Sequence, residues 1–163
     1  MAVTQQLVRM SRERADELST SAAALDALAG FQAAPPADHL DLDWAAIGLL
    51  KLAETQPSDV RAAIEQTLHG TARVALGAHP DIYSDVRILS AGEVQRVSES
   101  LMRVHSEAVV SVVPDDAREA ARFFQIAEFI GNPKAYFQRH LQALLDFVHE
   151  AAARRLAIVT WDE

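Results

Sequence analysis

The sequence contains no cysteine, only two lysines and no long hydrophobic run. Without cysteine the protein can form no disulfide, no thiolate nucleophile and no zinc–thiolate site. No segment approaches the run of about 18 apolar residues that a membrane-spanning helix needs. The N-terminal residues 1–7 also lack the apolar stretch of a signal peptide. We therefore expect a cytoplasmic protein that is not inserted in a membrane.

The overall composition is that of an acidic globular protein. The chain has 163 residues, a mean hydropathy of +0.01 and a net charge of −8, which together predict a single domain spanning residues 1–163. An acidic surface repels phosphates and anionic lipids, so we expect neither nucleic acid nor a membrane as a partner. The densest basic cluster, Arg9, Arg12 and Arg14, is interpreted as a solvated corner between a strand and a helix. The use of arginine over lysine, with abundant alanine, is typical of a GC-rich bacterial genome.

The end of the chain indicates the fold class. Residues 133–153 carry an apolar stripe at helical spacing, opened by Asn132 and Pro133, and predict one long helix. Residues 156–161 are apolar on both faces, as in a strand covered by helices on each side. We therefore predict an α/β (α+β) fold with a small sheet between helical layers.

The remaining segments can be assigned from their periodicity and their capping residues. A strand is predicted over 3–10, and a helix capped by Ser11 continues from it to Gly30. A loop follows to His39, and Asp43 is predicted to cap the next helix. Residues 108–113 fit a helix or a strand equally well. The other expected elements are a helix over 44–53, a helix from Pro57 to Gly70, a strand over 86–89, a helix opened by the Ser90–Glu93 capping box, and a helix over 117–130.

Two polar groups have the spacing of metal ligands, and we expect neither to bind a metal. His39, Asp41 and Asp43 would share one face of an extended segment, as oxygen ligands of magnesium or calcium can. Asp43, however, has a structural role as the predicted N-cap. Asp146 and His149 occupy one helical face, but di-iron bundles need such a carboxylate–histidine unit twice. The sequence also lacks the nucleophile elbow and the glycine-rich phosphate loops, so no cofactor is predicted.

The polar segment Tyr83–Arg87 is the best candidate binding loop. It leads from an irregular stretch into a strand and a capped helix, and binding groups often lie on loops held by rigid elements. Tyr83 and Arg87 can together hold a carboxylate, because arginine presents a planar fork of donors. The alternative interpretation is that Tyr83 fills the rim of the core and that Arg87 pairs with Asp85 or Glu93.

These residues also carry a resemblance to a known family. The segments 3–11, 40–49, 83–94 and 147–161 together resemble, in order, the YfbM-like bacterial proteins, a domain family of unknown function. The sequence departs from the family at Ser84, where a glycine is usual. It also departs around Gly48, where family members commonly carry histidines and aromatics, and where this chain has Ala46, Ile47, Leu50 and Lys51. The resemblance implies one α/β domain with a small mixed sheet, and a helix over 108–113. It supplies no catalytic residues.

Two functional hypotheses follow. The first is a non-enzymatic interaction or regulatory protein that contacts a partner through its 31–43 and 83–87 loops. One version is the neutraliser of a basic toxin domain, because an acidic face steers a basic partner. The second is a small-molecule-binding enzyme in which Asp41 or Asp43 acts as acid or base, and which requires Asp43, Tyr83 and Arg87 in one pocket. The candidate binding residues are Asp41, Asp43, Trp44, Tyr83 and Arg87.

Overall fold

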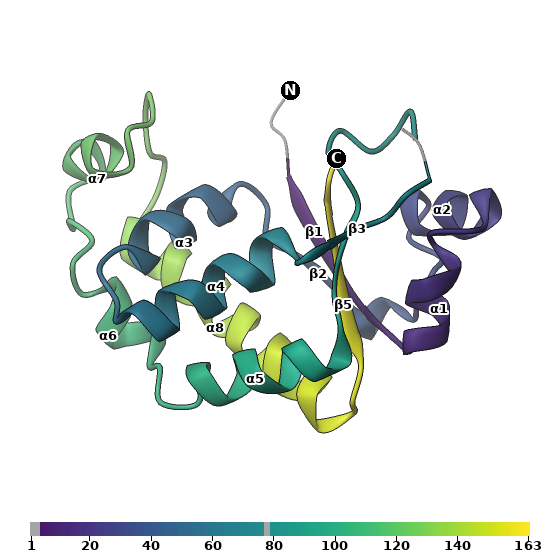
Figure 1. Cartoon of the computed structure of the whole chain (residues 1–163). Helices are drawn as coiled ribbons and strands as arrows, with labels where there is room; N and C mark the ends of the chain where they lie inside the picture. Colours follow the sequence, from purple (N-terminus) through teal and green to yellow (C-terminus); the bar gives the residue numbers. More distant parts are fainter. Residues whose placement is uncertain (1–3, 77–78) are drawn as a thin grey trace.

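A computed structural model describes residues 4–76 and 79–163 of the protein. Within these residues, five strands form one sheet in the order β2-β1-β5-β4-β3 (Figure 1). The strands are β1 Gln5–Met10, β2 His39–Asp41, β3 Ala72–Arg73, β4 Arg87–Leu89 and β5 Ala157–Asp162. Each recorded strand pair is antiparallel, so the sheet is not the mixed sheet that the resemblance implied.

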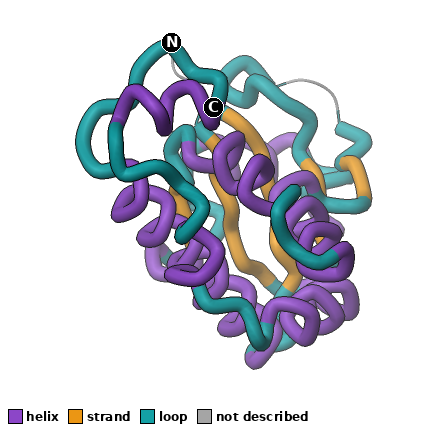
Figure 2. Tube along the Cα trace, turned by 90° about the vertical axis from the view of Figure 1, so that its left-hand side faces the viewer, coloured by secondary structure: helices purple, strands orange, loops and turns teal. Residues whose placement is uncertain are grey.

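Helices cover both faces of this sheet, which confirms the predicted fold class. We call α1 and α2 the thin layer, and α3 to α8 the thick layer; Figure 1 shows them on opposite sides of the strands. Seen from the side of the thick layer, several helices lie in front of the strands (Figure 2). The helices are α1 Arg12–Glu17, α2 Ala22–Ala29, the one-turn 3-10 helix η1 Pro36–Asp38, α3 Ala45–Ala53, α4 Ser58–His69, α5 Ala91–Leu101, α6 Ser106–Val110, α7 Ala117–Phe124 and α8 Pro133–Ala153.

The central strands β1 and β5 contribute side chains to two separate cores. Leu7 and Ile158 belong to the core under the thick layer, whereas Val8 and Val159 belong to the core under the thin layer. This alternation follows from the two-residue period of a strand. Ile158 and Val159 are both fully buried, so the prediction of a C-terminal strand covered on both faces is confirmed.

Capping residues explain most of the boundaries that the sequence predicted. Asn132 accepts from the Ala135 N–H with Pro133 as the first residue of α8, and Ser90 and Glu93 form the predicted capping box. Ser11 also caps α1 as predicted. The segment 108–113, which fitted a helix or a strand, overlaps the end of α6, so the helix is correct for residues 108–110, and residues 111–113 form a turn.

Two predicted helices are shorter in the structure. The helix expected from Ser11 to Gly30 is broken, because Ser21 adopts an extended conformation and caps a new helix, α2, through the Ala24 N–H. The helix expected over 117–130 ends at Phe124. Gln125 takes a left-handed conformation (φ 57°), and residues 125–132 are irregular.

The interpretation of Arg9, Arg12 and Arg14 as a solvated corner is wrong for Arg9. Arg9 is 8% exposed, and its Nε donates to the buried carboxylate of Asp38 at 3.1 Å. Arg154, at the end of α8, donates to the same carboxylate from the other side. The Asp38 carboxylate therefore connects η1 to β1 and to the end of α8, which are far apart in the sequence. None of the helices within the described residues is both long and apolar enough to cross a bilayer.

Candidate functional site

An aromatic cluster surrounds the start of α8. The Trp44 ring stacks on Tyr136 with centroids 4.6 Å apart, and it meets the ring of Phe129 edge-on at 5.3 Å. Phe137 lies beneath and is fully buried, and Gly48 of α3 leaves the space that this ring fills. Offset and edge-to-face pairs of this kind each contribute about 0.5–1.5 kcal/mol beyond area burial. The cluster therefore holds α3, α8 and the 125–132 segment in fixed relation.

Asp43 lies at the edge of this cluster and not at the N-cap of α3. Its backbone is left-handed (φ 52°), and the structure assigns the cap position to Trp44 with no side-chain hydrogen bond. The Asp41 carboxylate accepts from the Asp43 N–H at 2.6 Å and so stabilises this turn. Freed from capping, the Asp43 carboxylate accepts from the Tyr136 hydroxyl at 3.0 Å. The predicted capping role of Asp43 is therefore wrong, and its carboxylate faces α8.

Burial controls the protonation of the two neighbouring titratable side chains. Burial, followed by the hydrogen bond to Asp43, raises the pKa of Tyr136 well above its usual value. Burial, and then the positive charge of Arg139, lowers the pKa of His140. His140 is 8% exposed, and its Nε2 lies 3.2 Å from the Arg139 Nη2. Since arginine can only donate, this Nε2 accepts, and His140 is neutral at pH 7.

These shifts set the protonation states of Tyr136 and His140 at pH 7. A catalytic acid or base works best with a pKa near the operating pH. The phenol of Tyr136 is instead held protonated, and the imidazole of His140 is held neutral with its accepting nitrogen occupied. The group presents a rigid surface of aromatic rings bordered by the carboxylates of Asp41 and Asp43.

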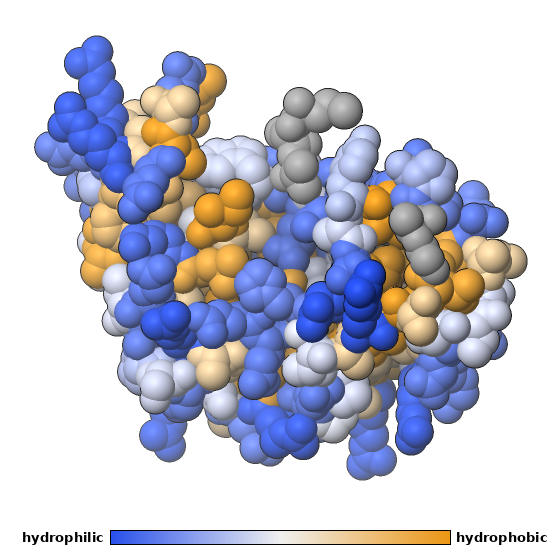
Figure 3. All heavy atoms as spheres, turned by 45° about the horizontal axis from the view of Figure 1, so that its top comes forward, coloured by the Kyte–Doolittle hydropathy of each residue, from blue (hydrophilic) through white to orange (hydrophobic). Residues whose placement is uncertain are grey.

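Exposed aliphatic side chains extend this surface. Ile47 is 68% exposed one turn after Trp44, and Ile130 is 84% exposed directly after Phe129. Trp44 precedes α3, which carries Ile47, and its ring contacts Phe129, the neighbour of Ile130 in the sequence. Figure 3 shows hydrophobic side chains at the surface over α3 and the region of α7. We define the contact surface as Asp41, Asp43, Trp44, Ile47 and Ile130.

The structure separates the remaining candidate residues from this surface. Tyr83 is 60% exposed and lines a hollow of about 220 Å³, whereas Arg87 lines a different hollow of about 240 Å³. Asp43 lines neither of them. The enzyme hypothesis required Asp43, Tyr83 and Arg87 in one pocket. Neither hollow contains all three residues, so neither is that pocket.

The alternative interpretation of Tyr83 and Arg87 as structural residues is also not supported. Asp85 pairs with Arg73 at 2.7 Å, and Glu93 closes the capping box with Ser90. Neither acid is therefore bonded to Arg87. Tyr83 is too exposed to fill the rim of the core.

His39, Asp41 and Asp43 do not converge. His39 Nε2 lies 3.1 Å from the Ala34 carbonyl, while Asp41 bonds to the turn at Asp43. Among the residues that the structure describes, no group of three or more His, Asp or Glu side chains is arranged to hold a metal.

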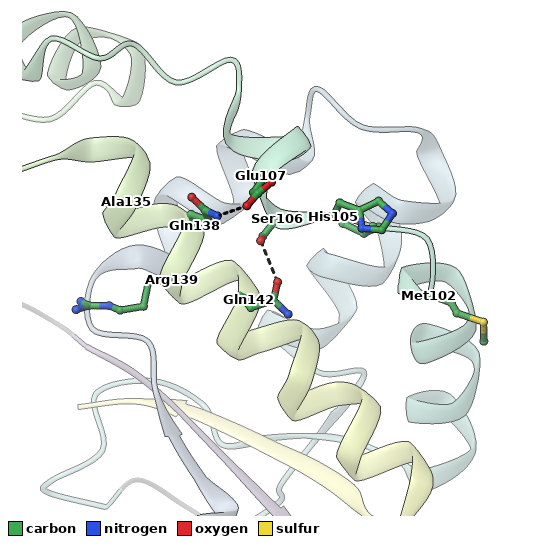
Figure 4. Close-up of a pocket in the computed structure, with 9 residues that line it drawn as sticks. Met102, His105, Ser106, Glu107, Ala135, Gln138, Arg139 and Gln142 are labelled. Atoms are coloured by element: carbon green, nitrogen blue, oxygen red, sulfur yellow. Dashed lines mark hydrogen bonds between the residues drawn. The ribbon is translucent and has the colours of Figure 1, made fainter.

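A larger hollow of about 680 Å³ lies on another face of α8 (Figure 4). Across it, Ser106 donates to Gln142 at 2.9 Å, and Gln138 donates to Glu107 at 3.3 Å. In Figure 4 the Arg139 and Met102 side chains point away from these pairs in opposite directions. Its central polar groups bond to one another, and the side chains of His105 and Arg139 complete its polar lining.

A solved structure shares this architecture. No family model matches the sequence, and no curated protein matches it. A structural comparison finds a crystal structure of YfbM from Escherichia coli, a protein of unknown function, with a TM-score of 0.63 and 10% sequence identity. The match covers 98% of this chain and 99% of that chain. The chain has the YfbM fold. The resemblance seen in the sequence is thus confirmed as a likeness of fold, and the YfbM structure attaches no activity to it.

Four residues of the site were missed by the sequence reasoning: Ile47, Ile130, Tyr136 and His140. Tyr136 and His140 are four residues apart, so they share one face of α8, and their ring centroids lie 4.5 Å apart. That spacing can be read from the sequence, but the hydrogen bond from Tyr136 to Asp43 joins residues 93 apart in the sequence. Ile130 was assigned to a buried helical stripe, and the early end of α7 places it at the surface.

Proposed function

We propose that this protein is a non-enzymatic interaction protein that binds another protein through its contact surface. The observation that carries the proposal is the pair of highly exposed isoleucines, Ile47 and Ile130, which lie close in sequence to Trp44 and Phe129, two rings that pack against each other. Exposed aliphatic groups that gather on a rigid scaffold are typical of protein-binding surfaces. An anchored aromatic residue at their centre is the usual composition of a binding hot spot.

The charge beside these isoleucines indicates the chemistry of the partner. Asp41 is exposed and Asp43 half-buried, and neither forms an ion pair with any residue that the structure describes. A partner segment with apolar side chains flanked by lysine or arginine would satisfy both features. The overall charge of −8 would also speed its association at low ionic strength.

The proposed setting is the cytoplasm of a bacterium. The absence of cysteine and the arginine-rich, alanine-rich composition support this placement. The proposed role is binding and regulation, which includes the neutralisation of a basic protein domain. The protonated phenol of Tyr136 and the neutral imidazole of His140 favour this role over acid–base catalysis.

The test compares variants of the exposed apolar residues in co-purification from the native cells, followed by identification and titration of the recovered protein. Ile47→Asp and Ile130→Asp should each weaken binding of a stoichiometric partner by about 30-fold or more, as loss of a hot-spot residue does. Met102→Asp is the matched control, because Met102 is 67% exposed at the end of α5 and lies outside the contact surface.

Two results would contradict the proposal. One is recovery of the same partner at equal affinity by the isoleucine variants and by the wild type. The other is the absence of any stoichiometric partner from every preparation. The charge contribution is tested separately with Asp41→Asn, which should slow association at low salt and leave dissociation unchanged.

A further inference from the structure

The hollow that Arg87 lines is at the end of the sheet where Gln5 of β1 pairs with Asp162 of β5. It has a volume of about 240 Å³ and lies between β4, β5 and the end of α4. Its polar lining includes the side chains of Gln5, Ser84, Arg87, Thr160 and Asp162. These residues come from three parts of the chain, and the antiparallel register brings them together by pairing Gln5 with Asp162 and Arg87 with Thr160.

Arg87 brings an unbalanced positive charge to this hollow. Within the described residues it forms no ion pair, and its Nε is buried with no hydrogen-bond partner. A buried donor left unsatisfied costs about 1–3 kcal/mol. Gly70 (φ 58°) packs directly against the Arg87 Cβ and the backbone of β4, which fixes where the side chain begins. The free Nε is therefore a feature of this position in the sheet.

Asp162 brings the opposite charge and is also free. Its carboxylate has no ion pair or hydrogen bond among the residues that the structure describes. Its backbone is held firmly, because the Asp162 N–H donates to the Ser84 Oγ at 2.8 Å and its carbonyl accepts from the Tyr83 N–H at 2.8 Å. In the strand register Thr160 lies opposite Arg87, which places Asp162 two residues further along β5.

The lining therefore holds one free cation and one free anion. The other carboxylate of the hollow, Asp85, is already paired with Arg73 at 2.7 Å. A carboxylate ligand alone would bond to Arg87 but be repelled by Asp162. An ammonium ligand alone would bond to Asp162 but be repelled by Arg87. A neutral zwitterion satisfies both groups without adding net charge.

We infer that this hollow binds a small α-amino acid, with the ligand carboxylate on Arg87 and the ligand ammonium on Asp162. The guanidinium gives two parallel donors that match a carboxylate. The hollow is large enough for a small amino acid, and the Ser84 hydroxyl on its wall offers a further polar contact. The residues of this site differ from those of the contact surface, although the two are connected where the Gln5 N–H donates to the Asp43 carbonyl at 3.1 Å.

Three matched probes test the inference by calorimetry on the whole protein. Alanine carries both charges, propionate lacks the ammonium, and ethylammonium lacks the carboxylate. Alanine, or glycine or serine in its place, should bind at millimolar concentration or tighter and raise the melting temperature, because it prefers the folded state. Propionate and ethylammonium should each bind at least tenfold more weakly than alanine.

Two variants assign the binding to the named residues. Arg87→Gln and the isosteric Asp162→Asn should each weaken alanine binding at least tenfold. Arg61→Gln, which removes an exposed arginine on α4, should leave alanine binding unchanged. Circular dichroism of each variant shows that it is folded.

Three outcomes would overturn the inference. The first is that glycine, alanine and serine all fail to bind the wild type at 10 mM. The second is equal binding of propionate and alanine, which would indicate an anion site. The third is a large interaction free energy between Arg87 and Asp162 in a double-mutant cycle, measured by urea denaturation without ligand. That result would show that the two side chains pair with each other.

Discussion

The two faces of the sheet are built in different ways. Under the thick layer, the core joins six helices and includes the ring cluster of Trp44, Tyr136 and Phe137. Under the thin layer, two short helices, the 31–34 loop and residues of the 74–86 segment cover a smaller core that includes Trp161. The indole Nε1 of Trp161 is buried there without a hydrogen-bond partner among the described residues. The same strands therefore support one densely packed face and one lightly covered face.

This difference shows where the fold can fix side chains for recognition. The contact surface lies on the thick layer, where close packing holds Trp44 against α8. Densely packed groups have fewer accessible conformations, so less entropy is lost when they bind a partner. The following predictions test whether the two faces differ in this way.

The largest effect is expected where α3 meets α8. Phe137→Ala should lower the free energy of unfolding by about 3–5 kcal/mol, because it removes a fully buried ring. Gly48→Ala should cost about 1–3 kcal/mol, since the added methyl group would overlap that ring. Urea denaturation measures both.

A control variant separates this overlap from a backbone effect. In a Phe137→Leu background, Gly48→Ala should cost much less, because alanine is about 1 kcal/mol better than glycine within a helix. If Gly48→Ala lowers the free energy of unfolding equally in both backgrounds, the Phe137 ring is not the reason that position 48 requires glycine.

The second prediction compares equivalent leucines under the two layers. Leu144 of α8 and Leu28 of α2 are both fully buried. Leu144→Ala should cost about 4–5 kcal/mol and Leu28→Ala about 2–3 kcal/mol, because a lightly covered site collapses more easily around a cavity. Urea denaturation of both variants provides the test, with the losses calculated from the denaturation midpoints and one common m-value. Equal losses would mean that the thin layer is packed as tightly as the thick one.

The smallest expected effect concerns Asp38, which is bonded by Arg9 and Arg154. Asp38→Asn should cost about 2 kcal/mol at pH 7, since it weakens hydrogen bonds to charged groups. Hydrogen bonds from Arg154, and then the charges of Arg154 and Arg9, hold the pKa of Asp38 below its usual value despite burial.

The sign of the pH dependence follows from that lowered pKa. The contribution of Asp38 is complete above its unfolded pKa of about 3.9 and is lost as the pH falls through the lower pKa of the folded state. The difference in the free energy of unfolding between wild type and Asp38→Asn should therefore shrink below about pH 4. A difference that stays constant from pH 7 to pH 2.5 would exclude this carboxylate as its source.

Local signals predicted much of the fold. The bounds of α8 were predicted correctly, because Asn132 and Pro133 open the helix and an apolar stripe runs along it. The capping box at Ser90 was equally reliable, since it depends on residues three apart. The break at Ser21 was missed, because the apolar spacing continues through it and gives no sign that the chain turns.

The candidate site was predicted only in part. Asp41, Asp43 and Trp44 were proposed together as binding residues, and the structure places them between the end of β2 and the start of α3; their role in binding stays a prediction. Their association with Tyr136 was not predicted, because it depends on how α8 packs against the turn after β2. Tyr83 and Arg87 were grouped by sequence proximity, but they line different hollows.

The sequence by itself determined the helices, the capping residues and the C-terminal strand that is covered on both faces. These features depend on side-chain periodicity and on hydrogen bonds between residues at most a few positions apart. Only the tertiary structure decided which distant polar groups come together: Asp43 bonds to Tyr136, Asp38 bonds to two arginines, and Arg87 and Asp162 line the same hollow. Strand register and helix packing create those meetings, and both result from burying the whole core at once.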